Sequence, residues 1–326
     1  MQDYKICVTG GAGFIGSHFV KFLRNKLGND VTIVVYDKLT YAADRLRLYG
    51  TNATIIEGDV CNGSLFLETL KKYEITHIVH FAAESHVDRS LKDDMPFIQT
   101  NILGTANVIE CATQIWINTP EGFNGKKLIH ISTDEVYGSI KVEEEPANEL
   151  SVLNPSNPYS ATKAAADQLV IGKMRSDRLP CLILRSSNVF GGLQHTEKFI
   201  PKTMSAIKEN TPIIVYGKGE QMRRWLDVET YSQIIWYLLE SSVVGEIFNV
   251  PGKEAYSNID LVKKMKQIYQ DYSKKEVSDI QFTKDRKSHD FFYNISGEKL
   301  ERWLMSVNKN VQYGKMEDFI LREVKG

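Results

Sequence analysis

The sequence predicts an α/β fold in which helices cover both faces of a doubly wound, parallel β-sheet. Short apolar runs rich in β-branched residues alternate with longer amphipathic segments through the first half of the 326 residues, which is the rhythm of βαβ units. The alternation ends near residue 187, and shorter strands and helices then follow in irregular order. We therefore predict a large lobe, residues 1–187, and a smaller C-terminal lobe, residues 188–326, with the chain able to cross between them.

Apolar periodicity places the individual elements. In the first half we expect strands at residues 5–9, 31–36, 54–57, 77–81, 127–132 and 181–185. Apolar residues at i, i+3 and i+4 predict helices at residues 14–27, 63–73, 96–115 and 159–175. In the second half we expect strands at 213–216 and 247–250, within the smaller lobe, and helices at 199–208, 230–240 and 258–272. The polar segment 138–157 is expected to form an exposed flap beside the site.

Composition narrows the classes of partner. The net charge of −1 gives no electrostatic reason to expect nucleic acid or an anionic membrane surface. No apolar run approaches the roughly 18 residues that a membrane span needs. The four cysteines form no CxxC pair, and the N-terminus has no signal-peptide pattern, so we expect reduced thiols in a cytoplasmic protein. The histidines show neither HxH nor HExxH spacing, so no metal site is expected.

A glycine-rich turn follows the first predicted strand and opens the first predicted helix. Gly10, Gly13 and Gly16 allow a tight turn, a close approach of the backbone to a pyrophosphate and close packing of the helix on the sheet. The N–H groups of Phe14 and Ile15 lie in the first turn of that helix, where a phosphate binds favourably. This context predicts a Rossmann-like dinucleotide site, although the turn could also serve packing alone.

An acidic residue at the end of the second strand specifies the dinucleotide. Asp37 lies 21 residues after Gly16, where a carboxylate binds the adenosine ribose diol. Its charge would repel a 2′-phosphate, which favours NAD over NADP, although Lys38 lies next to it. Asp59 and Val60, after the third strand, are expected to border the adenine.

A tyrosine and a lysine spaced i, i+4 supply the candidate chemistry. Tyr159 and Lys163 lie on one face of a predicted helix. A free tyrosine has a pKa of about 10, and a nearby ammonium and the cationic nicotinamide ring would both favour its phenolate. Ser132 and Thr133 end the fifth strand, at the sheet edge where ligands bind in such folds. We therefore predict that Tyr159 takes a proton from a substrate hydroxyl while hydride passes to NAD.

These motifs resemble the extended short-chain dehydrogenase/reductase superfamily. Four segments, residues 81–90, 132–138, 157–163 and 185–191, are similar within it to the nucleoside-diphosphate-glucose 4,6-dehydratases. The adjacent carboxyls of Asp134 and Glu135 are the most specific element, because the 4-epimerases and decarboxylases of the superfamily lack them. The similarity runs from the N-terminus to about residue 249. An alternative is that Asp134 and Glu135 merely cap the following turn.

The resemblance implies a reaction and a role for each catalytic residue. C4 of glucose is oxidised, C5 loses a proton to Glu135, the C6 hydroxyl leaves with a proton from Asp134, and hydride returns to C6. Thr133 hydrogen-bonds the C4 oxygen, and the product is a 4-keto-6-deoxy sugar nucleotide of a deoxysugar pathway such as that to rhamnose. With the residues derived above, the expected NAD-binding set is Gly10, Gly13, Phe14, Ile15, Gly16, Asp37, Lys38, Asp59, Val60, Ala82, Ala83, Thr100, Tyr159, Lys163 and Val189.

The resemblance also implies the substrate contacts and the assembly. Lys and Arg side chains suit a diphosphate, and the expected substrate set is Ser85, Asn188, Glu197, Lys198, Arg223, Asn249, Arg286 and Tyr293. Departures from the family pattern near the nucleotide pocket, such as Gly192 and Phe292, leave dTDP-glucose and UDP-glucose both open. A homodimer is implied through helices 96–115 and 159–175. The alternative functions are another sugar-nucleotide enzyme of this superfamily, such as a UDP-sugar 4-epimerase, and a non-catalytic NAD sensor.

Overall fold

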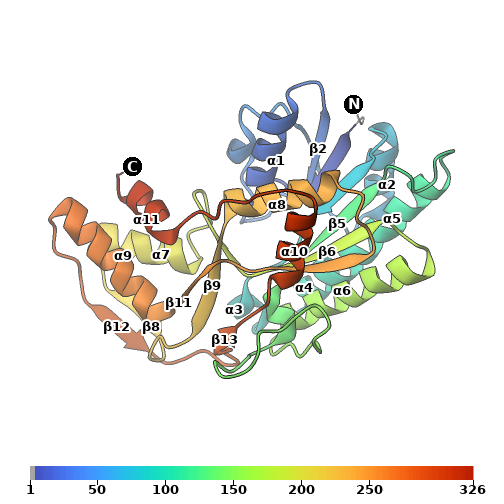
Figure 1. The fold of residues 1–326 in the computed structure, drawn as a ribbon. Helices are drawn as coiled ribbons and strands as arrows, with labels where there is room; N and C mark the ends of the chain where they lie inside the picture. Colours follow the sequence, from blue (N-terminus) through green and yellow to red (C-terminus); the bar gives the residue numbers. More distant parts are fainter. Residues whose placement is uncertain (1–3, 326) are drawn as a thin grey trace.

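The large lobe is built on one parallel sheet. The computed structural model describes residues 4–325, and within them seven strands pair in the order β10-β6-β5-β4-β1-β2-β3, every neighbouring pair parallel (Figure 1). The strands are β1 (Lys5–Thr9), β2 (Thr32–Asp37), β3 (Thr54–Glu57), β4 (His77–His80), β5 (Lys127–Thr133), β6 (Cys181–Ser186) and β10 (Glu246–Val250). The predicted α/β fold with a parallel sheet is confirmed.

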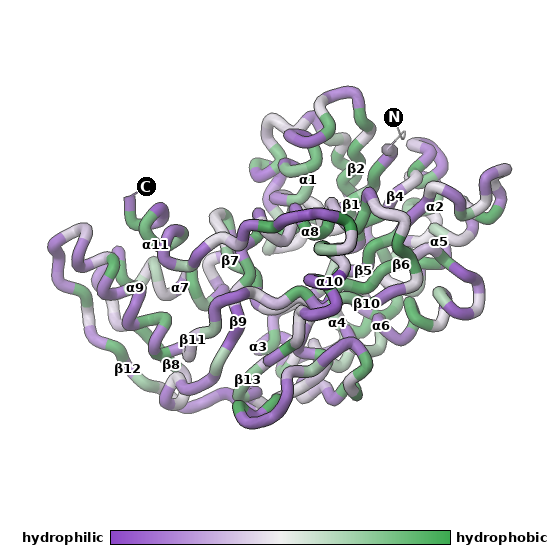
Figure 2. Tube along the Cα trace, in the orientation of Figure 1, coloured by the Kyte–Doolittle hydropathy of each residue, from purple (hydrophilic) through white to green (hydrophobic). Residues whose placement is uncertain are grey.

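Helices cover both faces of this sheet because successive strand residues point to opposite sides. Ile6 and Val8 pack with α1 (Phe14–Leu27) and α8 (Val228–Glu240), whereas Cys7 between them packs with the opposite layer. That layer consists of α2 (Gly63–Lys72), α5 (Thr105–Ile117) and α6 (Pro158–Ser176). Apolar segments run through the central strands, as expected for a sheet buried on both faces (Figure 2).

The smaller lobe has its own sheets and core. In the described part of the chain, β9 (Met222–Asp227) pairs with β7 (Asn188–Phe190), β11 (Glu254–Ser257) and β13 (Phe292–Tyr293), and β8 (Ile213–Tyr216) pairs with β12 (Ile280–Thr283). Around them pack α7 (Phe199–Lys208), α9 (Asn258–Ser273) and α11 (Met316–Lys325), which lie to one side of the large sheet in Figure 1. Finally, α10 (Glu298–Ser306) lies against β10.

The expected lobe of two elements requires correction. The strand predicted at 247–250 is β10 and belongs to the large sheet, where Phe248 lies beside Leu184 of β6, and the helix predicted at 230–240 is α8, which packs on α1. Periodicity predicts an apolar face but carries no information on which sheet covers it. The chain thus leaves the large lobe after β6 and returns to it for α8 and β10. The division at residue 187 stays a prediction.

The helix predicted at 96–115 is not continuous. It divides into α4 (Met95–Phe97), a π-helical segment (Ile98–Gly104) and α5. Asn101 in the π-helical segment bonds both backbone groups of Glu84 and the Thr162 hydroxyl of α6. Wide turns of this kind occur often at functional sites, and apolar spacing does not reveal them.

The segment 138–157 is fixed on the outside of the molecule. The N–H of Ala147 donates to Asn294 O at 2.9 Å, and the N–H of Ile140 donates to Phe292 O at 2.9 Å. None of its residues is among those that line the cavity described below. The expected flap therefore forms no part of the cavity wall, and backbone bonds to the β13 region hold the segment in place.

Candidate active site

A cavity of about 370 Å³ opens at the carboxyl ends of the central strands, where the strand order reverses between β1 and β4. All fifteen residues of the expected NAD set line it, from the glycine turn to Tyr159, Lys163 and Val189. Thr133, Asp134 and Glu135 line it as well, and so do Ser85, Asn188, Glu197 and Lys198 of the expected substrate set. The fold therefore gathers motifs from both lobes into one hollow.

The glycine turn is shaped by close backbone contacts. Gly10 has φ +67°, and a Cβ there would lie 2.7 Å from Ala82 N. A Cβ on Gly16 would lie 2.4 Å from Gly10 O, so a larger residue would push α1 off the turn. Gly13 is the N-cap of α1 and has no side-chain cap, so the first N–H groups of the helix face the cavity without a side-chain acceptor. Such a helix terminus suits a pyrophosphate.

Asp37 ends β2 at the rim of the cavity. Its carboxylate accepts hydrogen bonds from the N–H groups of Ala12 at 2.9 Å and Leu39 at 2.8 Å, and its side chain is buried. These bonds fix the carboxylate while leaving lone pairs for a ribose diol. Lys38 turns away to pair with Asp59 at 2.7 Å, which reduces its availability for a 2′-phosphate. The residues present therefore fit NAD.

The catalytic helix is held at its first turn. Asn157 accepts from the Ser160 N–H at 3.0 Å and donates its own N–H to the Ser160 hydroxyl at 3.2 Å, which forms a capping box ahead of Tyr159. One turn on, the Lys163 ammonium donates to Ile131 O of β5 at 2.7 Å. These contacts aim both side chains at the carboxyl end of β5.

Two adjacent carboxyls follow β5 in a short 3₁₀ turn (Asp134–Tyr137). Burial, together with the negative charge of Glu135, raises the pKa of Asp134 well above its ordinary value. Burial also raises the pKa of Glu135, but Arg223 and Arg286 act in the opposite direction. Burial thus favours the protonated form of Asp134, whereas at Glu135 two guanidinium groups counteract its effect, and a difference of this kind is what a general acid and a general base need.

The tyrosine–lysine pair is tuned mainly by burial. Burial and the Glu135 charge raise the pKa of Tyr159, while a hydrogen bond with Thr133 lowers it. Burial lowers the pKa of Lys163 to about 8, while the Asp167 carboxylate one turn further along α6 raises it. In the protein by itself, burial beside two carboxyls thus favours the neutral phenol of Tyr159. The positive charge of an oxidised nicotinamide would act against that effect.

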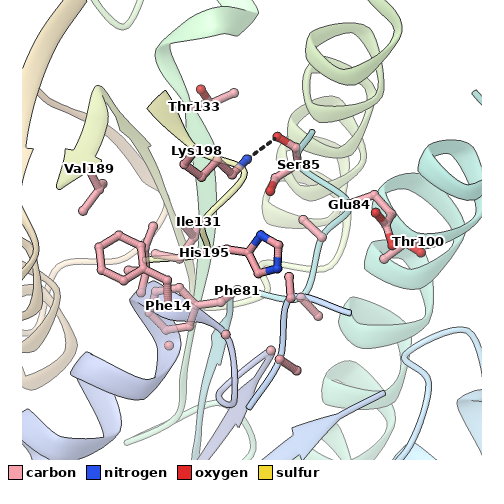
Figure 3. Close-up of a pocket in the computed structure, with 18 of the residues that line it drawn as sticks. Phe14, Phe81, Glu84, Ser85, Thr100, Ile131, Thr133, Val189, His195 and Lys198 are labelled. Carbon is pink, nitrogen blue, oxygen red and sulfur yellow. Dashed lines mark hydrogen bonds between the residues drawn. The ribbon is translucent and has the colours of Figure 1, made fainter. Parts of the chain in front are cut away.

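The smaller lobe contributes one wall of the cavity. Lys198, which precedes α7, points toward Ser85 and donates to its backbone carbonyl at 3.1 Å (Figure 3). Glu197 accepts from the Tyr41 hydroxyl at 3.2 Å, and the Arg89 guanidinium lies 3.6 Å from the centre of the Tyr41 ring. The loop after β2 is thereby joined to the smaller lobe over the cavity.

Four predicted substrate residues do not line the cavity. Asn249 is fully buried, and its amide bonds Tyr137 and the carbonyl of Ala147, so it braces segment 138–157. Arg223 donates to three backbone carbonyls, those of Met222, Phe291 and Asp290. Arg286 lies 3.6 Å from Asp88. Tyr293 directs its hydroxyl to Glu135, at 3.2 Å, and to Asp290, at 2.7 Å.

Sequence reasoning missed Asp290, Tyr41 and His195 at or beside this site. Tyr41 and His195 meet edge to face at a centroid distance of 5.5 Å, and His195 lines the cavity. Lone residues of these types in loops carry no periodic or spacing signal. The described cysteines are all free, and no cluster of potential metal ligands was found in residues 4–325. Over the same residues, every helix is too short or too polar to traverse a bilayer.

Comparisons with known proteins identify the family to which the chain belongs. The family model of GDP-mannose 4,6 dehydratase matches residues 7–305. A dTDP-glucose 4,6-dehydratase of Haemophilus influenzae is 38% identical over 307 residues, covering 90% of each chain. Two dTDP-glucose 4,6-dehydratase crystal structures with NAD bound superpose closely. That from Streptomyces venezuelae has a TM-score of 0.87 at 33% identity, over 98% of this chain and 96% of the other. That from Bacillus anthracis has a TM-score of 0.85 at 30% identity, over 99% and 96%. The resemblance seen in the motifs is confirmed, and the chain belongs to the GDP-mannose 4,6-dehydratase family of the extended short-chain dehydrogenase/reductase fold.

Proposed function

We propose that the protein is an NAD-dependent nucleotide-sugar 4,6-dehydratase that converts dTDP-glucose or UDP-glucose to the 4-keto-6-deoxy sugar nucleotide. One observation carries the proposal: the Asp134–Glu135 pair, Tyr159 and Lys163 share a single cavity with the glycine turn and Asp37. Relatives named as dTDP-glucose 4,6-dehydratases support the same reaction. A non-catalytic NAD sensor would not need to retain this acid, base and tyrosine together.

The protonation state of each side chain determines its proposed role in the reaction. NAD, which the glycine turn and Asp37 would hold, would supply a hydride acceptor for C4 and then a hydride donor for C6. Tyr159 removes the C4 hydroxyl proton, and Thr133 hydrogen-bonds the C4 oxygen. The resulting ketone acidifies C5, so Glu135 can remove the C5 proton while Asp134 protonates the departing C6 hydroxyl, and water leaves. Glu135 then returns a proton to C5. Because the hydride returns to the same sugar, the cofactor undergoes no net change.

Product analysis tests this function directly. Incubation with dTDP-glucose and with UDP-glucose, without added NAD, should give the alkali-induced absorbance of a 4-keto sugar with at least one of them. Activity should need no external NAD when the protein retains its cofactor during purification. A galactose nucleotide without a keto product would instead identify a 4-epimerase. A requirement for stoichiometric NAD would contradict the internal hydride return.

The proposal extends to assembly and compartment. We propose a homodimer formed through the segments at 98–117 and 158–176, because Leu103 and Leu169 there are 54% and 37% exposed. We propose the cytoplasm as the compartment, since the four cysteines are free thiols. A rhamnose-type deoxysugar is the proposed end product of the pathway. A substrate that is a nucleotide sugar is consistent with all of these assignments.

The dimer can be tested by placing charges in the proposed interface. The double variant Leu103→Glu/Leu169→Glu should dissociate, because carboxylates would be forced into an apolar contact. Light scattering coupled to gel filtration should show the mass falling from two chains to one. Leu46→Glu is a matched control, because Leu46 is 78% exposed on a short 3₁₀ turn (Arg45–Leu48) elsewhere. A monomeric wild type, or a double variant that stays dimeric, would contradict the proposal.

A further inference from the structure

The hydroxyl of Tyr293 lies between two carboxylates. It is 2.7 Å from Asp290 Oδ2 and 3.2 Å from Glu135 Oε2. A phenol has one proton and can donate it to only one acceptor at a time. The shorter distance is typical of an O–H···O bond, and the longer one exceeds the usual range. The geometry therefore indicates that the Tyr293 hydroxyl donates its hydrogen bond to Asp290 and makes only a weak contact with Glu135.

Asp290 is itself fixed from two further directions. Its side chain is 7% exposed, and the Ser156 hydroxyl donates to the same Oδ2 that receives the Tyr293 proton. The Arg223 guanidinium donates to the Asp290 backbone carbonyl at 3.0 Å and lies 4.2 Å from the centre of the Tyr293 ring. Asp290 thus connects β13 and β9 to the segment just before α6, which carries Tyr159.

We propose that Asp290 is a positioning residue for the reaction: by accepting the hydrogen bond of the Tyr293 hydroxyl, it withholds from the Glu135 carboxylate a hydrogen bond that would weaken Glu135 as a base. This inference rests on the proposed function, because that function makes Glu135 the group that removes the C5 proton. We name these three residues the base network. Asp290 does not contact the sugar in this scheme and acts only through its neighbours.

The charges around the base network explain why the hydrogen bond of the Tyr293 hydroxyl affects the pKa of Glu135. Glu135 faces Asp134 on its own turn, Tyr159 of α6, Tyr293 of β13 and three cationic side chains, those of Arg223, Arg286 and Lys198. The guanidinium groups of Arg223 and Arg286, the contact with Tyr293 and the Lys198 ammonium each lower the pKa of Glu135, against the larger effect of burial. A full hydrogen bond from Tyr293 would lower it further, because such a bond favours the ionised form. Asp290 limits that lowering of the pKa by accepting the Tyr293 hydrogen bond itself.

Replacing Asp290 by asparagine tests the proposal. Tyr293 should then donate to the charged Glu135 rather than to a neutral amide. The probe is the 6-deoxyglucose form of the accepted nucleotide, which allows C4 oxidation and C5 proton exchange but has no C6 leaving group. In D₂O, the variant should incorporate deuterium at C5 about tenfold more slowly, and the pH midpoint of exchange should move to lower pH. Formation of the reduced cofactor, which reports C4 oxidation, should change little.

A double-mutant cycle separates this role from a purely structural one. In a Tyr293→Phe background, Asp290→Asn should cause no further change in exchange, because the link is already missing. Asp227→Asn is the matched control: Asp227 is also 7% exposed, caps α8 by accepting from Thr230, and lies outside the cavity lining. It should leave the midpoint unchanged. Asp290→Glu keeps the charge, so its rate of C5 exchange should lie between those of Asp290→Asn and the wild type. The same variant provides the test if the asparagine variant does not fold.

The outcomes distinguish the two proposals. If the wild type makes no 4-keto product, the proposed function fails. If the wild type is active but Asp290→Asn matches Asp227→Asn in rate and midpoint, the base network is wrong. An additive effect of Asp290→Asn and Tyr293→Phe would also overturn it. If the asparagine variant fails to fold, an Asp290→Glu variant whose C5 exchange is slower while C4 oxidation stays near the wild-type rate supports the base network, and loss of C4 oxidation together with exchange contradicts it.

Discussion

Tyr159→Phe should abolish C4 oxidation while NAD remains bound. The variant keeps the ring and loses only the hydroxyl that, in the proposed mechanism, removes the C4 proton. General acid–base groups contribute roughly 10²–10⁴-fold, so the rate of reduced-cofactor formation on mixing with substrate should fall by about that factor. Because the ring remains, packing against Phe97 at a centroid distance of 6.4 Å should persist.

Cofactor content provides the control for this variant. NAD released by denaturation should match the wild type, since the glycine turn and Asp37 are untouched. A thermal unfolding midpoint close to that of the wild type would confirm that the fold is intact. Turnover near the wild-type rate would remove Tyr159 from the mechanism. Loss of both NAD and activity would instead indicate a structural role.

Glu135→Gln should have the second largest effect, and it should affect a different step. The amide keeps the shape of the side chain and its contact with Tyr293 but cannot take the C5 proton. Elimination should slow by roughly 10²–10⁴-fold, while C4 oxidation survives, so reduced cofactor should accumulate on the enzyme. Deuterium incorporation at C5 of the 6-deoxyglucose probe should fall in parallel.

The two variants should block the reaction at different steps. Tyr159→Phe stops the reaction before reduced cofactor forms, whereas Glu135→Gln stops it afterwards. Asp134→Asn should resemble Glu135→Gln in accumulating reduced cofactor, but C5 exchange should persist, since the base is intact. C5 exchange that is unchanged in Glu135→Gln would show that another group is the base.

Local patterns predicted the cofactor half well because its elements are consecutive in sequence. Strands 5–9 and 54–57 and helix 14–27 coincide with β1, β3 and α1. The turn, the acid after β2 and the YxxxK spacing are all short-range signals, and they meet because strand ends of a parallel sheet lie on one edge. Predicted site residues that line the cavity come almost entirely from such segments.

The remaining features depend on contacts between distant positions. Tyr293 lies 158 residues from Glu135, and Asp290 lies 134 residues from Ser156, so no window of sequence shows their meeting. Arg223 illustrates the same limit. A basic side chain suits a diphosphate, yet here its donors are occupied by the backbone carbonyls around β13. Charge type alone does not decide whether an arginine faces a ligand or a neighbouring strand.

The return of the chain to the large sheet also has a consequence for synthesis. β10 forms the outer edge beside β6, and the two strands are separated by about sixty residues that build much of the other lobe. A nascent chain that has emerged only as far as residue 187 therefore exposes the unpaired edge of β6, and it also lacks α8 over one face. The large lobe reaches its final form only after α10, which packs against β10, has left the ribosome. Fragments that end at the apparent lobe boundary should consequently be prone to edge-to-edge association. Two halves of the chain made separately should therefore assemble into an active enzyme less readily than the intact chain folds.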